Sequence, residues 1–166
     1  MGKGPRYRMP LKRRLEGKTD YRTRLNLIKS GKPRAVVRIS NNNVIIQLVK
    51  YHSDGDQVIM TVTTEKLEDY GWKGSCANIP GAYLVGFLAG KKALETGIEE
   101  AVLDIGMNVP HPRGKLFAAL KGMLEAGLDI PHSPDILPDD EKVKGEHINE
   151  NIVKQFDNVK NNLEEL

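Results

Sequence analysis

The side chains most able to do chemistry in this sequence are thirteen cations within its first 38 residues, and that chemistry is phosphate binding. Only Glu16 and Asp20 oppose them, so the segment from Gly2 to Arg38 carries a charge of +11. Because the whole chain carries +3, all later residues sum to −8. Eight of the thirteen are Arg, whose planar guanidinium holds phosphate with two hydrogen bonds and also stacks on bases. This asymmetry predicts that the N-terminal end binds a polyanion.

Two aromatic residues are interleaved with these cations, which favours nucleic acid over other polyanions. Tyr7 and Tyr21 can stack on unpaired bases, or alternatively can hold the basic segment against the protein core. The segment lacks the apolar face of a lipid-binding helix, so a membrane surface is not the expected partner. Besides Lys3, which adds charge, the candidate RNA-binding cations are Arg6, Arg8, Lys12, Arg13, Arg14, Lys18, Arg22, Arg24, Lys29 and Lys32.

Further candidates for RNA contact lie at the end of this segment and beyond it. Arg34 and Arg38 lie on the outer face of the first expected strand and would extend the basic surface onto a sheet. Asn42 is central in an Asn-rich turn, where simple turn chemistry is the alternative explanation. Trp72 and Lys73 lie in a loop flanked by glycines; the alternative for a single Trp is a place in the core.

Catalytic and metal-binding constellations are weak in this sequence. The four His are scattered, and Cys76 is the only cysteine, with no base close to it in sequence. A metal-dependent nuclease needs several carboxylates together, and the best available set is Asp54, Asp56 and Asp104. The glycines of 86–92 fall inside an expected helix, unlike those of a phosphate-binding loop. The sequence therefore predicts no catalytic residue, metal, cofactor or small-molecule substrate.

The gross composition is that of a soluble domain. A chain of 166 residues with 39% hydrophobic residues is long enough to bury a core. Its longest apolar run is far shorter than the roughly 20 residues needed to cross a bilayer, and no apolar segment follows the basic N-terminus. We therefore expect a cytoplasmic protein without a membrane partner.

Alternating apolar residues predict strands at 34–39, 44–51 and 58–62, joined by short turns as an antiparallel meander. A helix is expected from the N-cap Asn78 to Gly97, with a strip formed by Ala82, Gly86 and Gly90 that suits close approach to a sheet. A fourth strand at 101–105 and a helix at 114–126 follow. The expected fold class is α+β, or α/β layered: the meander followed by helix, strand and helix gives a mixed sheet with packed helices.

The two ends of the chain differ from this centre. The N-terminal segment opens extended and includes a short helix capped by Asp20. A Pro-rich acidic stretch after Asp129 leads to an amphipathic helix, expected to dock on the core, with a partner surface as the alternative. Its apolar residues are Ile148, Ile152, Phe156, Val159, Leu163 and Leu166. We expect three parts: a basic RNA-binding arm at 1–33, a mixed core at 34–128, and an acidic segment with a C-terminal helix at 129–166.

Several segments, in order along most of the chain, resemble the archaeal-type family of large-subunit ribosomal protein number eighteen. They are Gly4-Pro-Arg-Tyr-Arg8, Gly17-Lys-Thr-Asp-Tyr-Arg22, Ser30-Gly-Lys-Pro-Arg34, Gly71-Trp-Lys-Gly74, Leu88-Ala-Gly-Lys-Lys-Ala93, Ala101-Val-Leu-Asp-Ile-Gly106, Phe117-Ala-Ala-Leu-Lys-Gly122 and Gly145-Glu-His-Ile148. The resemblance implies a non-enzymatic ribosomal protein that binds 5S rRNA. It also implies attachment of that RNA in the central protuberance of the large subunit, beside 23S rRNA and ribosomal protein five. The arm is then expected to become ordered on RNA.

Overall fold

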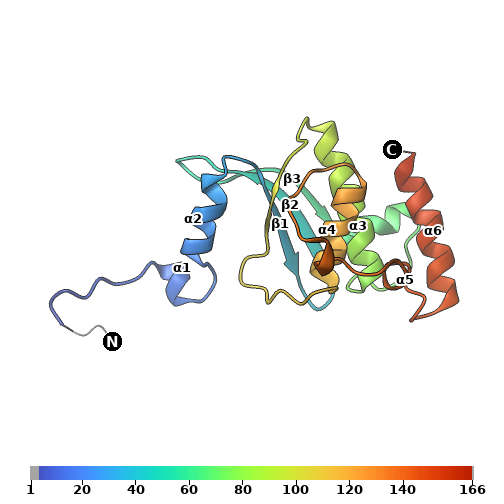
Figure 1. The fold of residues 1–166 in the computed structure, drawn as a ribbon, viewed down its shortest axis with the longest axis horizontal. Helices are drawn as coiled ribbons and strands as arrows, with labels where there is room; N and C mark the ends of the chain where they lie inside the picture. The colour runs from blue at the N-terminus through green and yellow to red at the C-terminus, as the bar shows by residue number, and fades with distance from the viewer. Residues whose placement is uncertain (1–3, 166) are drawn as a thin grey trace.

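A computed structural model describes residues 4–165, which form a sheet with packed helices and a projecting N-terminal segment (Figure 1). Lys3 and Leu166, counted above in the arm and in the C-terminal stripe, lie outside the described residues. The elements in chain order are α1 (Lys12–Leu15), α2 (Tyr21–Lys29), β1 (Arg34–Ile39), β2 (Val44–Lys50), β3 (Gln57–Thr63), the 3-10 helix η1 (Thr64–Tyr70), α3 (Ile79–Glu95), β4 (Val102–Asp104), α4 (Lys115–Glu125), the 3-10 helix η2 (Pro134–Ile136), α5 (Asp140–Lys144) and α6 (Glu150–Glu164). Within this range, none of the helices combines the length and apolar character that a membrane span requires.

The sheet confirms the predicted mixed topology and the α+β class. Strands β1, β2 and β3 form the antiparallel meander, and β4 pairs in parallel with β1, giving the order β3-β2-β1-β4. The predicted alternation is present, because Ala35, Val37, Ile46 and Leu48 are fully buried in the core cluster that includes α3 and α4. Burial of these side chains is the main favourable term that holds the sheet to the helices.

The small-residue strip of α3 packs against α4, which corrects the prediction that it approaches the sheet. A Cβ atom added at Gly86 would overlap the carbonyl oxygen of Ala119, and one added at Gly122 would overlap that of Tyr83. Gly90 faces Met123 in the same way. The two helix backbones are therefore in direct contact, and glycine is required on both sides of the contact.

The C-terminal helix α6 docks on the core, as its apolar spacing predicts. Phe156, Val159 and Leu163 are buried, and the Phe156 ring lies 5.3 Å from that of Tyr83, measured between centroids. The Tyr83 hydroxyl donates to Glu125, which also accepts a hydrogen bond of 3.2 Å from Lys160 of α6. Burial, followed by this contact with Glu125, raises the pKa of Tyr83, so the phenol stays a donor. The apolar face of α6 is thus part of the core rather than a partner surface.

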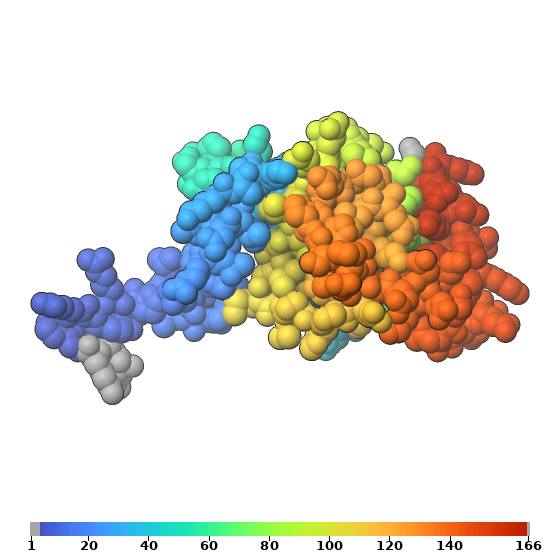
Figure 2. Space-filling view, viewed as in Figure 1, coloured from blue at the N-terminus to red at the C-terminus, as the bar shows by residue number. Residues whose placement is uncertain are grey.

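The molecule is elongated, with its two charged ends far apart. Figure 1 shows α1 and α2 at one end, beyond the sheet, and α6 at the opposite end, with α3 and α4 between. In the space-filling view the N-terminal residues extend as a narrow projection from the body (Figure 2). From Asp129 onward the chain holds ten carboxylates and four Lys, a charge of −6, so a polyanion that meets the basic end is kept away from this one.

Candidate nucleic-acid interface

The basic arm contains two helices, and the second begins where the sequence predicts. Asp20 caps α2: its Oδ1 accepts the backbone N–H groups of Arg22 at 2.9 Å and Thr23 at 3.3 Å. The Thr23 hydroxyl donates to the other oxygen of Asp20 at 2.7 Å, and these hydrogen bonds, led by that of the hydroxyl, hold the pKa of Asp20 below its usual range. This cap begins α2 at Tyr21, so the orientation of the helix that carries Arg22 and Arg24 is set locally.

Most predicted contact residues present their side chains to solvent. Neither α1 nor α2 contains a buried residue, so both helices lie outside the core. The predicted site residues that are exposed are Arg6, Tyr7, Arg8, Lys12, Arg13, Arg14, Lys18, Arg22, Lys29, Arg38, Asn42 and Lys73. Tyr21, Arg24 and Lys32 are half-buried. Lys32 forms an ion pair with Glu100 at 2.5 Å, which fastens the end of the arm to the loop before β4.

Arg34 is buried, so the prediction that its side chain extends the RNA-binding surface is wrong. Its side chain is 4% exposed, and its terminal nitrogens bind Asp104 at 2.7 Å and Asp56 at 2.6 Å. The reason is the position of β1 inside the sheet, because β4 lies beside it and brings Asp104 next to Arg34. A buried guanidinium needs such carboxylate partners to offset its desolvation.

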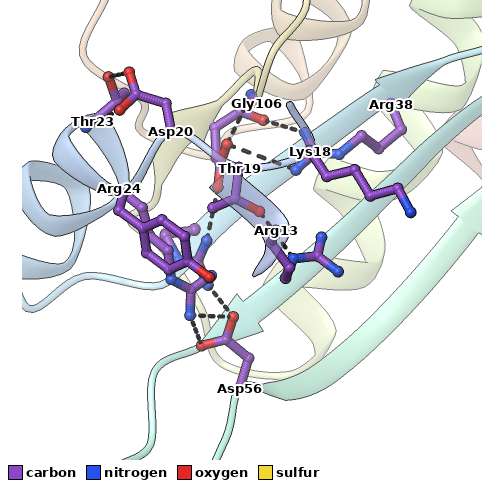
Figure 3. A pocket seen from close by; sticks show the side chains of 12 residues that line it. Arg13, Lys18, Thr19, Asp20, Thr23, Arg24, Arg38, Asp56 and Gly106 are labelled. Carbon is purple, nitrogen blue, oxygen red and sulfur yellow. Dashed lines mark hydrogen bonds and ion pairs between the residues drawn. The ribbon is translucent and has the colours of Figure 1, made fainter. Parts of the chain in front are cut away.

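A chain of alternating charges extends from Arg34 in both directions. Arg24 of α2 binds Asp56 at 2.8 Å, and Arg38 of β1 lies 3.8 Å from Asp104 while donating to that residue's carbonyl oxygen at 3.3 Å. The order is therefore Arg24, Asp56, Arg34, Asp104, Arg38, and Figure 3 shows the Arg24–Asp56 contact at one end. This chain ties α2 to the sheet, and it places a cation that faces solvent at each end.

The stability of this ion-pair chain is expected to depend on pH through Asp56. Burial alone would raise the pKa of Asp56, but hydrogen bonds and charges from Arg24 and Arg34 outweigh it and lower that pKa. A lowered folded-state pKa gives stability that is fully present above the unfolded value, about 4, and is lost as pH falls through the folded value. The free energy of unfolding, measured by urea titration, should therefore fall below about pH 4. Asp56→Asn should flatten that fall, whereas Asp54→Asn in the exposed turn should not; equal profiles for both variants would contradict this assignment.

Two of the three carboxylates considered for a nuclease site bind Arg34. Asp56 and Asp104 each point a carboxylate oxygen at its guanidinium, while the side chain of Asp54 is 90% exposed in the turn. Among residues 4–165, no group of three or more His, Cys, Asp or Glu side chains is arranged to hold a metal ion. Asp56 and Asp104 thus position arginine side chains.

Trp72 also lies in the core, so the prediction that it stacks on RNA is wrong and the alternative is confirmed. The residue is 1% exposed, and its indole N–H points to the carbonyl oxygen of Ser75 at 3.4 Å. Gly74 covers the ring so closely that a Cβ there would clash with it. The turn around Asn42 shows ordinary turn chemistry, since Ser40 and Asn43 exchange hydrogen bonds of 2.8 and 2.9 Å. Asn42 itself is exposed and stays a prediction.

A cavity of about 410 Å³ opens between the arm and the sheet, beside the ion-pair chain (Figure 3). It brings together predicted site residues that are far apart in the sequence, from α1, α2 and β1. Its lining includes Arg13, Lys18, Tyr21, Arg24, Arg38 and Gly106. Sequence reasoning missed the roles of Asp56, Asp104 and Gly106 at this site. The only local signal was an Asp on a strand that is otherwise apolar.

The chain is similar to proteins of the large ribosomal subunit. Residues 5–98 match the model of a family described as ribosomal large subunit proteins 60S L5 and 50S L18. A large ribosomal subunit protein uL18 of Aeropyrum pernix is 54% identical over 149 residues, which cover 89% of this chain and 70% of the relative. A large ribosomal subunit protein uL18 of Haloarcula marismortui is 51% identical over 150 residues, covering 90% of this chain and 80% of the relative.

Proposed function

Because the chain belongs to the family of ribosomal large-subunit proteins 60S L5 and 50S L18, we propose that its basic arm binds 5S rRNA. It is an archaeal-type structural protein of the large ribosomal subunit and not an enzyme, so its chemistry is that of binding ribosomal RNA. We extend the proposal to attachment of 5S rRNA to 23S rRNA in the central protuberance, next to ribosomal protein five. The segregation of charge carries this proposal: +11 lies in the first 38 residues and −8 in the rest.

The three parts of the chain then have separate tasks. The arm at 1–33 supplies cations for the phosphate backbone, the core at 34–128 supports it, and the acidic segment at 129–166 faces away from RNA. Exposed arginines such as Arg6 and Arg8 suit phosphate contacts, which give affinity with little sequence information. Arg38 extends this surface onto the sheet, and exposed Tyr7 offers a ring to an unpaired base.

The proposed function is tested by direct binding of the purified protein to 5S rRNA, with a transfer RNA as competitor. We expect 5S rRNA to be preferred and the preference to persist as salt increases, because specific recognition adds contacts beyond the phosphate term. Equal affinity for both RNAs at every salt concentration would show that the protein binds RNA without specificity, and it would refute the 5S assignment.

A double variant of the extended arm measures its phosphate contacts. If Arg6 and Arg8 each neutralise one phosphate, replacing both with Ala should lower the magnitude of the log affinity–log salt slope by about 1.5. The matched control is Lys142→Ala with Lys144→Ala, which removes the same charge from exposed residues of α5 in the acidic segment. That control should leave the slope unchanged. Equal changes in the two double variants would mean that net charge, and not contact by the arm, sets the salt dependence.

A further inference from the structure

We propose that the cavity between the arm and the sheet holds one unpaired nucleotide of the bound RNA, with its phosphate on Arg13 and Arg24 and its base against Tyr21. The inference rests on the proposed function and deepens it, because it assigns a discrete pocket within the RNA-binding surface. The other arm cations then contact the backbone on either side of this nucleotide.

The cavity has the size and construction of a ligand site. Its volume of about 410 Å³ falls in the range of roughly 300–1,000 Å³ that is typical of small-molecule pockets, which is more than a phosphate alone requires. Its walls come from α1, α2 and the linker between them, from β1, from Asp56 just before β3, and from Asp104 of β4 with Gly106 after it. Because α2 is tied to the sheet through Asp56, the opposing walls are held at a set separation before RNA arrives.

Two arginines in the lining have donors left for a ligand. The Arg13 Nε donates to the Thr19 hydroxyl at 2.9 Å, and its two terminal nitrogens have no hydrogen-bond partner within residues 4–165 (Figure 3). Arg24 binds Asp56 through one terminal nitrogen, and no other described residue accepts from its remaining nitrogens. Each guanidinium is thus oriented by one hydrogen bond and keeps donors for phosphate.

The carboxylates of the lining are already occupied, so they do not repel an anion as free carboxylates would. Asp20 accepts three hydrogen bonds as the cap of α2, and Asp56 binds two arginines. Asp104 binds Arg34 and accepts the backbone N–H of Gly106 at 2.9 Å. Five cations against three carboxylates leave a net charge of +2 around the cavity, which favours an anionic ligand.

Tyr21 is the reason to propose a nucleotide and not a bare phosphate. It is the aromatic residue of the lining, it is half-buried, and it begins α2 directly after the N-cap residue Asp20. Unpaired RNA bases are commonly recognised by stacking on Tyr rings, with the adjoining phosphate held by Arg. The cavity thus offers an aromatic ring for the base of a nucleotide and two guanidinium groups for its phosphate.

Neighbouring arginines on the same helices provide matched controls for a binding experiment. Arg13 and Arg14 are both exposed on α1, and Arg22 and Arg24 are both on α2, yet Arg13 and Arg24 line the cavity and their neighbours do not. We expect Arg13→Ala and Arg24→Ala each to weaken 5S rRNA binding about tenfold or more. Arg14→Ala and Arg22→Ala should weaken it about threefold or less. Thermal unfolding of each variant checks that the fold is retained.

The base contact has its own pair of variants. Tyr21→Ala should weaken binding by about 5- to 150-fold, the range for loss of one stacked base, with little change in salt slope. Tyr21→Phe keeps the ring and should bind within about twofold of the unchanged protein. If Tyr21→Phe loses as much as Tyr21→Ala, the hydroxyl and not a stacked base is responsible, and the nucleotide assignment is overturned.

The outcomes separate this inference from the proposed function. If the unchanged protein shows no preference for 5S rRNA, the proposed function fails whatever the variants do. If it binds 5S rRNA specifically but Arg13→Ala and Arg14→Ala lose affinity equally, the arm acts as a uniform basic surface. Only the assignment of the cavity is then overturned.

Discussion

Replacing Asp104 with Ala is expected to lower the free energy of unfolding by roughly 3–5 kcal/mol, among the largest effects of any single side chain here. Arg34 is 4% exposed and would lose its partner at 2.7 Å, leaving a buried guanidinium that depends on Asp56 alone. The Gly106 N–H and the Arg38 side chain would lose a partner as well. Urea unfolding followed by circular dichroism measures the change.

Two controls distinguish a buried charge from simple loss of an ion pair. Asp139→Ala removes the partner of Arg113 at 3.5 Å, where both side chains are more than half exposed, and should cost less than about 1 kcal/mol. The double variant Arg34→Met with Asp104→Leu removes both buried charges and should recover most of the lost stability. If Asp104→Ala is no more destabilising than Asp139→Ala, the network around Arg34 does not hold the sheet edge as described.

Replacing Gly86 with Ala is expected to destabilise the protein by about 3 kcal/mol or more, at the upper end of the usual cost of overpacking. The added methyl group would overlap the backbone of Ala119, which cannot rotate away as a side chain would. The predicted loss opposes intrinsic helix propensity, because Ala in a helix interior is favoured over Gly by up to about 1 kcal/mol. Gly122→Ala, on the other side of the contact, should behave in the same way.

The matched control for these glycine variants is an Ala introduced at an exposed helix position. Asn158→Ala on the exposed side of α6 should leave stability unchanged or raise it slightly, because Ala is the better helix former. Thermal unfolding of the Gly86→Ala, Gly122→Ala and Asn158→Ala proteins compares their stabilities directly. A Gly86→Ala protein that is as stable as the Asn158→Ala protein would mean that α3 and α4 separate at no cost, contrary to their direct backbone contact.

The helices, the strands and the distribution of charge could be predicted from the amino-acid sequence. Alternating apolar residues located β1, β2 and β3, and caps at Asp20 and Asn78 located the starts of α2 and α3. Such signals are readable because they arise between residues close in the chain, within a helical turn or along one strand. The basic arm was equally readable, because net charge is a sum that needs no fold.

Which of these side chains contact one another depends on how distant segments of the chain pack together. Arg34 and Asp104 lie 70 residues apart, and they form an ion pair because β4 docks in parallel beside β1. The sequence pattern places Arg34 on an outer face and cannot show that partners cover it, just as it cannot show that Gly86 meets α4. The cavity beside Arg13 and Arg24 has the same origin: cations spaced along the arm become one site when an ion pair with Asp56 draws α2 onto the sheet.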